Sequence, residues 1–332
     1  MLSLLPLSLL VGETLEEQIS ILEQKLNAIT DCSVYQTLTP EFLSSKEALD
    51  GFGLYLTGDA LYWKMFEAGT EFVYTDVNRV LDQASNLQPI IGKSKKVDFN
   101  WNWGYRVGAA YTIPCSAWGT YLNYTHLDNK GEKSAEQPPN GVLAPLYLTY
   151  TPAHTFSALS KWNVSFSTLD LEFGRDFFVS RYLNLRPYVG IRGARINQHV
   201  HAHYVDFVDS IDDHVSLKNN FSGVGLRGGL GSQWFFWKRF NFCLDASASL
   251  LRGRFKVKFI ENATIPFFPT TGILNDRYSA LIPNVQFYLG FGWETCACGS
   301  WSCAIKAGYE SQYWWNQNQI PHSEVSIRFP YG

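Results

Sequence analysis

Hydrophobic and polar residues alternate strictly along residues 97–112, VDFNWNWGYRVGAAYT. One set of alternate positions is apolar or aromatic, and it comprises Val97, Phe99, Trp101, Trp103, Tyr105, Val107, Ala109 and Tyr111. The other set is polar or small and includes Asp98 and Arg106. Because successive side chains of a strand point to opposite faces, the pattern predicts a β-strand with one apolar and one polar face. A soluble sandwich would bury the apolar face in a core, whereas a membrane barrel would place it against lipid.

The same two-residue rhythm continues from Gly51 to the end of the chain. It predicts about 10 antiparallel strands, near residues 52–74, 97–112, 118–128, 155–173, 183–197, 221–236, 239–259, 279–295, 301–315 and 324–329. Residues 141–150 could supply part of another hairpin, so 12 strands is the alternative. Several of these strands exceed the roughly 9–11 residues that cross a bilayer when tilted, which predicts a barrel that projects beyond the membrane.

The connections between the predicted strands alternate in length. Short turns fall near residues 113–117, 174–182, 237–238 and 296–300, and long loops cover about 77–96, 129–154, 198–220 and 260–278. Outer-membrane barrels have short periplasmic turns and longer extracellular loops. The alternation therefore predicts a bacterial outer-membrane barrel with both termini in the periplasm.

Composition agrees with a transmembrane β-barrel. Charged residues make up 17% of the chain, below the roughly 25% of soluble domains, while aromatic residues reach 16%. The formal net charge of -3 excludes the basic footprint of a nucleic-acid-binding protein. Between the termini, no run approaches the roughly 20 apolar residues of a transmembrane helix. The predicted fold class is therefore all-β, with outer-membrane lipid as the partner of the apolar face.

The first 50 residues divide into three segments. Residues 1–12 are apolar and are interpreted as the remnant of an export signal, the alternative being an apolar tail of a soluble helix. Residues 13–31 place Leu15, Ile19, Leu22, Leu26 and Ile29 on a heptad seam. This seam predicts a short periplasmic helix that either supports a homotrimer or lies on the protein as a single amphipathic helix. Residues 32–50 would form a linker, and residues 51–332 the barrel.

Five ordered segments carry a resemblance to a known family. They are GDALYWK (58–64), FNWNWGYRVG (99–108), LDLEFGR (169–175), LRPYVGIRG (185–193) and GVGLRGG (223–229). Together they resemble the pore-forming outer-membrane proteins of Legionella, a family similar to the major outer-membrane proteins and also present in Chlamydia-related bacteria. The resemblance implies passive diffusion of ions and small solutes, with no catalytic residue and no cofactor.

Charged residues on the predicted inward faces would line such a pore. They are Asp98, Arg106, Lys161, Arg186, Arg192, Arg227, Asp245, Arg254, Lys256, Glu294, Lys306 and Glu310. Since basic residues outnumber acidic ones in this set, weak anion selectivity is expected. The alternative is that these side chains interlock and close the lumen, which would make the protein a structural or adhesive barrel. An outer-membrane hydrolase is a further alternative, although no nucleophile motif supports it.

Two other motifs suggest chemistry. Residues 223–228 fit a dinucleotide-binding glycine pattern, but their alternation predicts a strand and not the turn into a helix that the motif requires. His199, His201 and His203 would share one face of an extended segment, which makes them weak candidates for a transition-metal site. No metal or other cofactor is otherwise expected.

The chain has six cysteines, Cys32, Cys115, Cys243, Cys296, Cys298 and Cys303. All six fall at the predicted periplasmic end of the barrel. Since the periplasm is oxidising, at least one is expected to form an inter-strand or inter-chain disulfide, linking copies of this chain or other outer-membrane proteins. The resemblance to a family in Chlamydia-related bacteria, whose outer membranes are disulfide cross-linked, implies the same. The alternative is that the cysteines are reduced and buried as small hydrophobic residues.

Overall fold

The computed structural model describes residues 53–76, 92–113, 116–139, 141–148, 155–206, 211–237, 239–264, 270–297 and 301–319. These residues form thirteen strands: β1 (Leu54–Lys64), β2 (Glu71–Asp76), β3 (Gly92–Lys96), β4 (Trp101–Thr112), β5 (Trp118–Glu136), β6 (Val142–Pro145), β7 (Thr155–Arg175), β8 (Phe177–Ser180), β9 (Leu183–Asp206), β10 (Ile211–Trp237), β11 (Phe240–Thr264), β12 (Thr270–Ala297) and β13 (Trp301–Trp314). Among these residues no helix has the length and apolar character to span a membrane. The predicted export signal, heptad helix, linker and last strand (324–329) lie outside the described residues.

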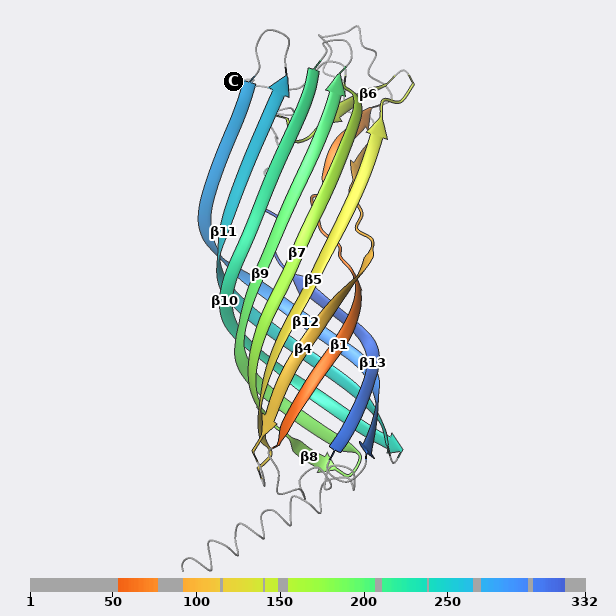
Figure 1. Cartoon of the computed structure of the whole chain (residues 1–332), viewed down its shortest axis with the longest axis vertical. Coiled ribbons are helices and arrows are strands. Elements are labelled where there is room, and N and C mark those ends of the chain that lie inside the picture. The colour runs from red at the N-terminus through yellow and green to blue at the C-terminus, as the bar shows by residue number, and fades with distance from the viewer. Residues whose placement is uncertain are drawn as a thin grey trace, which may run out of the picture.

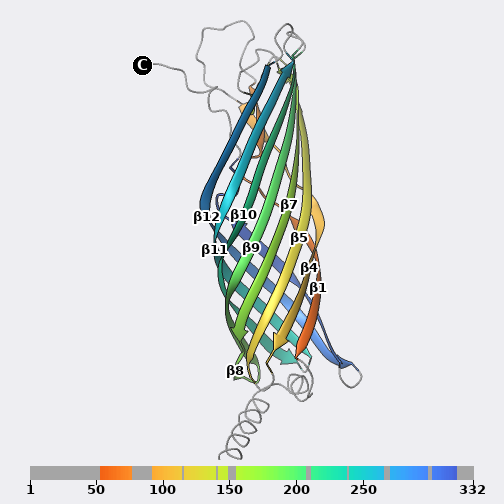
Figure 2. The same ribbon diagram turned by 60° about the vertical axis from the view of Figure 1, so that its left-hand side comes forward.

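Nine long strands form one continuous antiparallel sheet in the order β1-β4-β5-β7-β9-β10-β11-β12-β13. The sheet curls round on itself into a tall, narrow barrel-like shape (Figures 1 and 2). Within the described part of the chain no backbone ladder joins the two edge strands, β1 and β13. Short strands complete the ends: β2, β3 and β6 associate at one end, and β8 pairs with β9 at the other. The all-β class is confirmed, and the nine strands of the path leave the predicted total of about 10 open.

Along each long strand the same alternate residues point outward from one end to the other. Halfway along, these outward residues change from apolar to polar, and the inward residues change from polar to apolar. On β10 near its β8 end, Leu226 points outward with 75% exposure, while Arg227 points inward with 6%. Further along the same strand, Lys218 points outward, while Phe221 and Leu217 are buried inside. The same exchange occurs on β7, β9, β11 and β12. The barrel therefore has a belt section near β8 and a head section near β6 with opposite arrangements of polar and apolar residues.

The belt section carries large apolar side chains on its outer surface, and we call these the apolar belt. The belt includes Leu169, Leu171, Phe173, Val189, Ile191, Val224, Leu226, Leu230, Leu250, Leu281, Val285, Phe287, Leu289 and Phe291. Along β12 it runs from Leu281 to Phe291; at a rise of about 3.3 Å per residue and a tilt of about 45°, this is a height of about 23 Å. Membrane barrels have an apolar band about 25 Å tall, which this belt matches.

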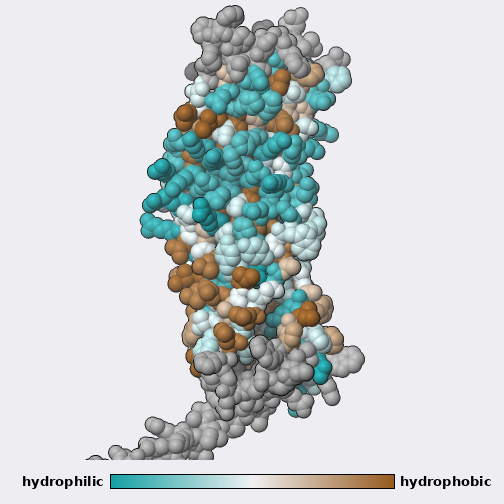
Figure 3. Space-filling model, in the orientation of Figure 1, coloured by the Kyte–Doolittle hydropathy of each residue, from teal (hydrophilic) through white to brown (hydrophobic). Residues whose placement is uncertain are grey.

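The head section is built like a soluble protein, since its outer surface is polar and its interior is apolar. Figure 3 shows the difference as a hydrophilic zone above a hydrophobic one. The core of the head section includes Phe72, Val97, Phe99, Leu127, Trp162, Val164, Phe166, Ile196, Val200, Tyr204, Leu217, Phe221, Phe255 and Phe259. Burial of these side chains stabilises the head section through the hydrophobic effect. Strands of up to 28 residues are long enough for the predicted projection of the barrel beyond a bilayer.

Large parts of three predicted long loops are strands. β9 continues to Asp206, β10 begins at Ile211 and β12 already begins at Thr270, so the loops predicted at 198–220 and 260–278 are wrong over most of their length. The loop predicted at 129–154 is wrong where β5 continues to Glu136 and where β6 lies. The sequence of these segments suggests loops because their outward residues are polar, including three histidines. Their inward residues, such as Val200 and Tyr204, are buried in the core of the head section. The connections at the two ends of the barrel therefore differ less in length than the sequence predicts, and this difference was the basis for the predicted orientation.

The strict alternation of residues 97–112 also contains a break that the sequence does not show. Phe99 forms a bridge to Gly131, whereas Gly104 pairs with Leu127, so the register between the two segments shifts by one residue. As a result Phe99 is buried with 2% exposure, while Trp101 points outward with 53% exposure. An extra residue of this kind is a β-bulge, which re-aims the side chains before it. The predicted outward position of Val97 and Phe99 is therefore wrong.

Candidate functional site: the charged interior of the belt section

Arg192 of β9 is the most deeply buried charge inside the belt section, with 1% exposure. Its Nε and Nη2 atoms donate to the two carboxylate oxygens of Asp170 on β7, at 2.6 and 2.8 Å. Nη2 also donates to Gln286 Oε1 on β12 at 2.7 Å, and Nη1 donates to Asn284 Oδ1. A bidentate arginine–carboxylate pair of this kind is among the strongest hydrogen-bonded arrangements in proteins. Together these contacts connect β7 and β9 to β12 through the interior.

Arg227 of β10 extends the same network. Its Nε donates to Glu172 Oε1 at 3.0 Å, and its Nη1 donates to Gln286 Oε1 at 2.9 Å. Arg186 of β9 lies 3.6 Å from the other carboxylate oxygen of Glu172. Because Gln286 accepts hydrogen bonds from both Arg192 and Arg227, the two arginines belong to one connected cluster.

Arg106 of β4 links this cluster to the edges of the sheet. Its two terminal nitrogens donate to the carboxylate oxygens of Glu310 on β13 at 3.0 and 2.8 Å. One of them also lies 3.7 Å from Asp59 of β1. Gln286 Nε2 donates to Glu310 Oε1 at 2.6 Å, which completes a path of polar contacts from β4 to β9. Side chains thus bring the β1–β4 edge close to β13, although no backbone ladder joins these edges among the described residues.

The remaining interior charges lie nearer the β8 end. Asp245 accepts a hydrogen bond from the Tyr188 hydroxyl at 2.9 Å, and Glu294 accepts one from Asn241 Nδ2 at 3.0 Å. Lys306 pairs in register with the buried, inward Gly292, so it belongs to an inward row.

The structure places eight of the twelve predicted pore-lining residues on the inward faces of the belt section. They are Arg106, Arg186, Arg192, Arg227, Asp245, Glu294, Lys306 and Glu310.

The other four, Asp98, Lys161, Arg254 and Lys256, are exposed on the outer surface, and their predicted inward position is wrong. Lys161 pairs with Glu132 on that surface at 3.2 Å. The prediction assumed that polar residues face inward along the whole strand, whereas in the head section polar residues face outward.

Sequence reasoning missed three interior acids: Asp59, which lies opposite Arg106 in the register of β1 and β4, and the pair Asp170 and Glu172. The pair alternates with the outward residues Leu169, Leu171 and Phe173, so the two-residue pattern could have found it. With all three included, six acids (Asp59, Asp170, Glu172, Asp245, Glu294, Glu310) face five bases (Arg106, Arg186, Arg192, Arg227, Lys306). The excess of basic residues that suggested anion selectivity is therefore absent from this set.

The interior of the head section is filled by large apolar side chains. Trp162 has 0% exposure, and Phe221 and Phe255 have 1% and 0%. In strand register Phe166, Ile196, Phe221 and Phe255 form one inward row, which a row of small residues (Thr168, Ala194, Gly223, Gly253) separates from the charged cluster. Gly223 and Gly253 leave room for the Phe221 ring, since a Cβ atom at either position would lie within 2.7 Å of it. Phe166, Ile196, Phe221 and Phe255 are 0–5% exposed, so almost none of their surface contacts water.

One ionisable group lies beside this apolar interior. The carboxyl group of Glu67, between β1 and β2, is removed from water, and this burial raises its pKa to about 7 although a hydrogen bond with Gln198 opposes the shift. A substantial fraction of Glu67 is therefore neutral near pH 7. Protonation of this group reduces the cost of burying it at the edge of the head-section core.

The three candidate metal ligands do not converge on one point. The His199 and His201 rings lie 4.0 Å apart on the outer surface, and burial is the main cause that lowers the pKa of His199 to about 4. His203 instead lies with Asp212 and His214 of β10, and the ligand atoms of these three residues lie within 4.8 Å of one another. A metal role for these histidines stays a prediction.

Two of the six cysteines have described side chains, and both are free: Cys243 is buried and Cys303 is exposed. The side chains of Cys32, Cys115, Cys296 and Cys298 lie outside the described part of the structure. Cys243 follows the β10–β11 turn, and Cys303 follows the β12–β13 connection, so both lie near the β8 end. Disulfide cross-linking of this rim stays a prediction.

A curled antiparallel sheet with an apolar outer belt and a charged interior defines a membrane β-barrel. The comparison with known families agrees with this class. A family model described as the Legionella pneumophila major outer membrane protein precursor matches residues 52–329. The chain belongs to this family, which confirms the resemblance seen in the sequence and supports an outer-membrane location. No curated protein matches the chain closely enough to count as a relative.

Proposed function

We propose that this protein is a porin-like barrel that passes ions and small solutes, and that an apolar gate in the head section limits the passage. Family membership and the charged interior of the belt section support a pore. The observation that carries the gate is the inward row of Phe166, Ile196, Phe221 and Phe255, which is buried inside the head section. Apolar constrictions block conduction because water does not fill them, so ions would have to shed their hydration to pass.

Planar-bilayer recording of the purified protein tests this proposal. The native barrel is expected to show low conductance with long closed periods. Phe221→Ala or Phe255→Ala is expected to raise the conductance several-fold, because each change removes a ring from the gate. Phe287→Ala is the matched control, since Phe287 lies on the outer belt and its loss leaves the lumen unchanged. Only variants that migrate as folded barrels on unheated gels are compared.

A second function is favoured by the same filled interior. If the head section never opens, the protein is a structural or adhesive barrel that presents its polar head outside the membrane. In that case neither the native protein nor the two gate variants would conduct, although all of them are folded. Absence of conductance from all three proteins would therefore exclude the pore.

We further propose that the β8 end, where β1 begins, faces the periplasm. The described residues end in the head section, where Gln317 contacts Asn219 and Asn318 contacts Ala68, so a periplasmic C-terminus stays a prediction. A membrane-impermeant maleimide should then label Cys303 only after the outer membrane is permeabilised, because Cys303 lies near the β8 end. An engineered Asn262→Cys variant is the control, since Asn262 is exposed on the head section and should be labelled on intact cells. Mass mapping identifies the labelled peptides. Labelling of Cys303 on intact cells would reverse the proposed orientation. Cys243 should stay unlabelled in the folded barrel because it is buried.

The assembly state is also a proposal. The heptad pattern of residues 13–31 supports a homotrimer, and the cysteines near the β8 end support disulfide links between copies or to other outer-membrane proteins.

A further inference from the structure

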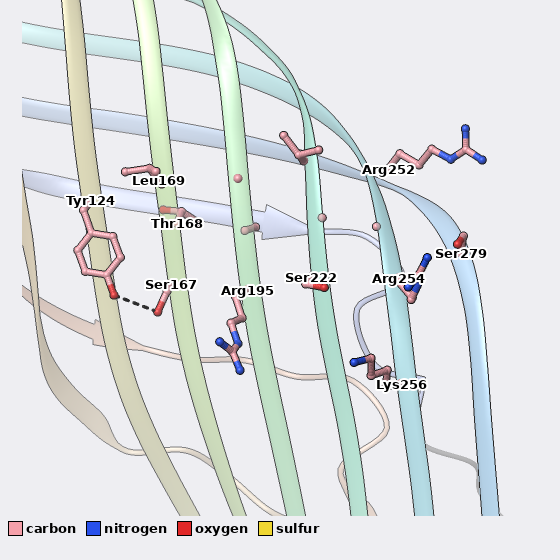
Figure 4. Close-up of a pocket in the computed structure, with 15 residues that line it drawn as sticks. Tyr124, Ser167, Thr168, Leu169, Arg195, Ser222, Arg252, Arg254, Lys256 and Ser279 are labelled. Atoms are coloured by element: carbon pink, nitrogen blue, oxygen red, sulfur yellow. Dashed lines mark hydrogen bonds between the residues drawn. The ribbon is translucent and has the colours of Figure 1, made fainter.

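Four basic side chains lie together on the outer surface just beyond the apolar belt. Arg252, Arg254 and Lys256 occupy alternate, outward positions of β11. Arg195 of β9 joins them, because Arg254 and Arg195 both pair with Ser222 of the strand between them. All four side chains are exposed. We call this surface the cationic groove (Figure 4).

These four charges have no acidic partner in the part of the chain that the structure describes. No carboxylate oxygen there lies within 4.0 Å of their nitrogen atoms, although the same criterion finds the exposed pair of Lys161 and Glu132. Along β11 the basic positions are separated by about 6.6 Å, twice the rise per residue. Like charges at this spacing repel one another, so an anion between them would relieve the repulsion.

The surface between these side chains is hollowed. A groove of about 880 Å³ is lined by the four basic residues and, on its floor, by Gly193. A Cβ atom at Gly193 would meet only the carbonyl oxygen of Leu169, at 3.8 Å, so the floor is open because this residue has no side chain. Hydroxyl groups of Ser167, Ser222 and Ser279 lie around the groove and can donate hydrogen bonds to an anion (Figure 4).

The position of the groove indicates the kind of anion. One side of it is formed by Leu169 and Val224, which are part of the apolar belt, and the other side by Arg195, Arg254 and Lys256. Arg252 lies at the boundary, in the register row of Val224. A molecule that fills it needs an apolar part at the level of the belt and negative charge immediately beyond it. Membrane lipids with phosphate in their headgroups have this arrangement, and clusters of basic residues at a membrane surface attract them.

We propose that the cationic groove binds the phosphate groups of a lipid in the leaflet beside it. In the orientation proposed above, that leaflet is the outer one, and the ligand is a phosphorylated glycolipid whose acyl chains lie against the apolar belt. The guanidinium groups of Arg195, Arg252 and Arg254 can each donate two hydrogen bonds to one phosphate, which Lys256 supplements as a point charge.

The test compares two variants of the full-length protein with the same change in charge. The first replaces Arg195, Arg252, Arg254 and Lys256 with glutamine. The control replaces Lys93, Lys95, Lys96 and Lys133, four exposed lysines of β3 and β5, with glutamine. Titration of bisphosphorylated lipid A into each detergent-solubilised protein, followed by native mass spectrometry, is expected to show affinity at least tenfold weaker for the groove variant and within twofold of native for the control.

Three results would overturn the proposal. The first is unchanged lipid binding by the groove variant, and the second is an equal loss in the control variant, which would indicate general electrostatic attraction. The third is displacement of the lipid by inorganic phosphate at 20-fold excess, which would indicate a site for a small free anion.

Titration with phosphatidylglycerol separates the two leaflets: tighter binding of this phospholipid than of lipid A would overturn the assignment to the outer-leaflet glycolipid. The orientation itself is tested separately by labelling of Cys303.

Discussion

Replacement of Arg192 with methionine is expected to destabilise the barrel by about 3–5 kcal/mol, the usual cost of removing one partner of a buried ion pair. The change leaves the Asp170 carboxylate inside the belt section without its bidentate partner, and its remaining ion-pair contact, to Arg227, is at 4.0 Å. It also removes the hydrogen bonds that Asn284 and Gln286 receive from Arg192. Urea unfolding of the protein reconstituted in lipid vesicles measures the loss in the free energy of unfolding.

Two further variants separate the ion pair from other effects. Arg192→Met combined with Asp170→Leu should recover most of the lost stability, because no unpaired charge remains buried. Lys161→Met is the control for an exposed pair, and loss of its contact with Glu132 should cost at most about 1 kcal/mol. An Arg192→Met variant as stable as Lys161→Met would mean that the charged cluster does not hold the belt section together.

Replacement of Val189 with arginine is expected to cost about 2–4 kcal/mol, as for a basic residue near the middle of a bilayer. Val189 is 66% exposed and lies in the register row of Phe173 and Val285, close to half the height of the apolar belt. Its new charge would therefore face hydrocarbon. The measurement is again unfolding in lipid vesicles, together with the fraction of protein that inserts.

The matched control lies on the same face of the same strand. Asn197→Arg places arginine eight residues further along β9, on the outer surface of the head section, where it should change stability by less than about 0.5 kcal/mol. Equal tolerance of the two changes would show that the apolar belt does not contact lipid.

Alternation along the chain predicted the all-β class and the inward direction of residues such as Arg106, Arg192 and Arg227. It succeeded in the belt section because there the apolar residues face outward, as the membrane interpretation assumed. It failed for Arg254 and Lys256 because alternation shows that two faces differ but not which face is inside. In the head section the surroundings of the barrel change from lipid to water. There the apolar residues of the alternating pattern face inward and the polar residues face outward.

Two other features depend on contacts that no local pattern contains. The shift of Phe99 into the core arises from its pairing with Gly131, and this register is set by a partner strand. The contact of Arg106 with Glu310 joins residues 204 positions apart in the chain. Sequence pattern could place both side chains on inward faces, but only the curl of the sheet brings them together.

Beside Arg252 the outer surface changes from apolar to polar, and this boundary also determines how deeply the protein sits in its membrane. A shift by one row of side chains, about 4.7 Å along the membrane normal at a tilt of about 45°, would either bring a row of leucines into water or draw arginines into hydrocarbon. Both directions are unfavourable, so the depth of immersion is set to within one row. A bilayer thicker or thinner than the belt must then compress or stretch around the protein. The barrel thus imposes its own local thickness on the lipid that surrounds it.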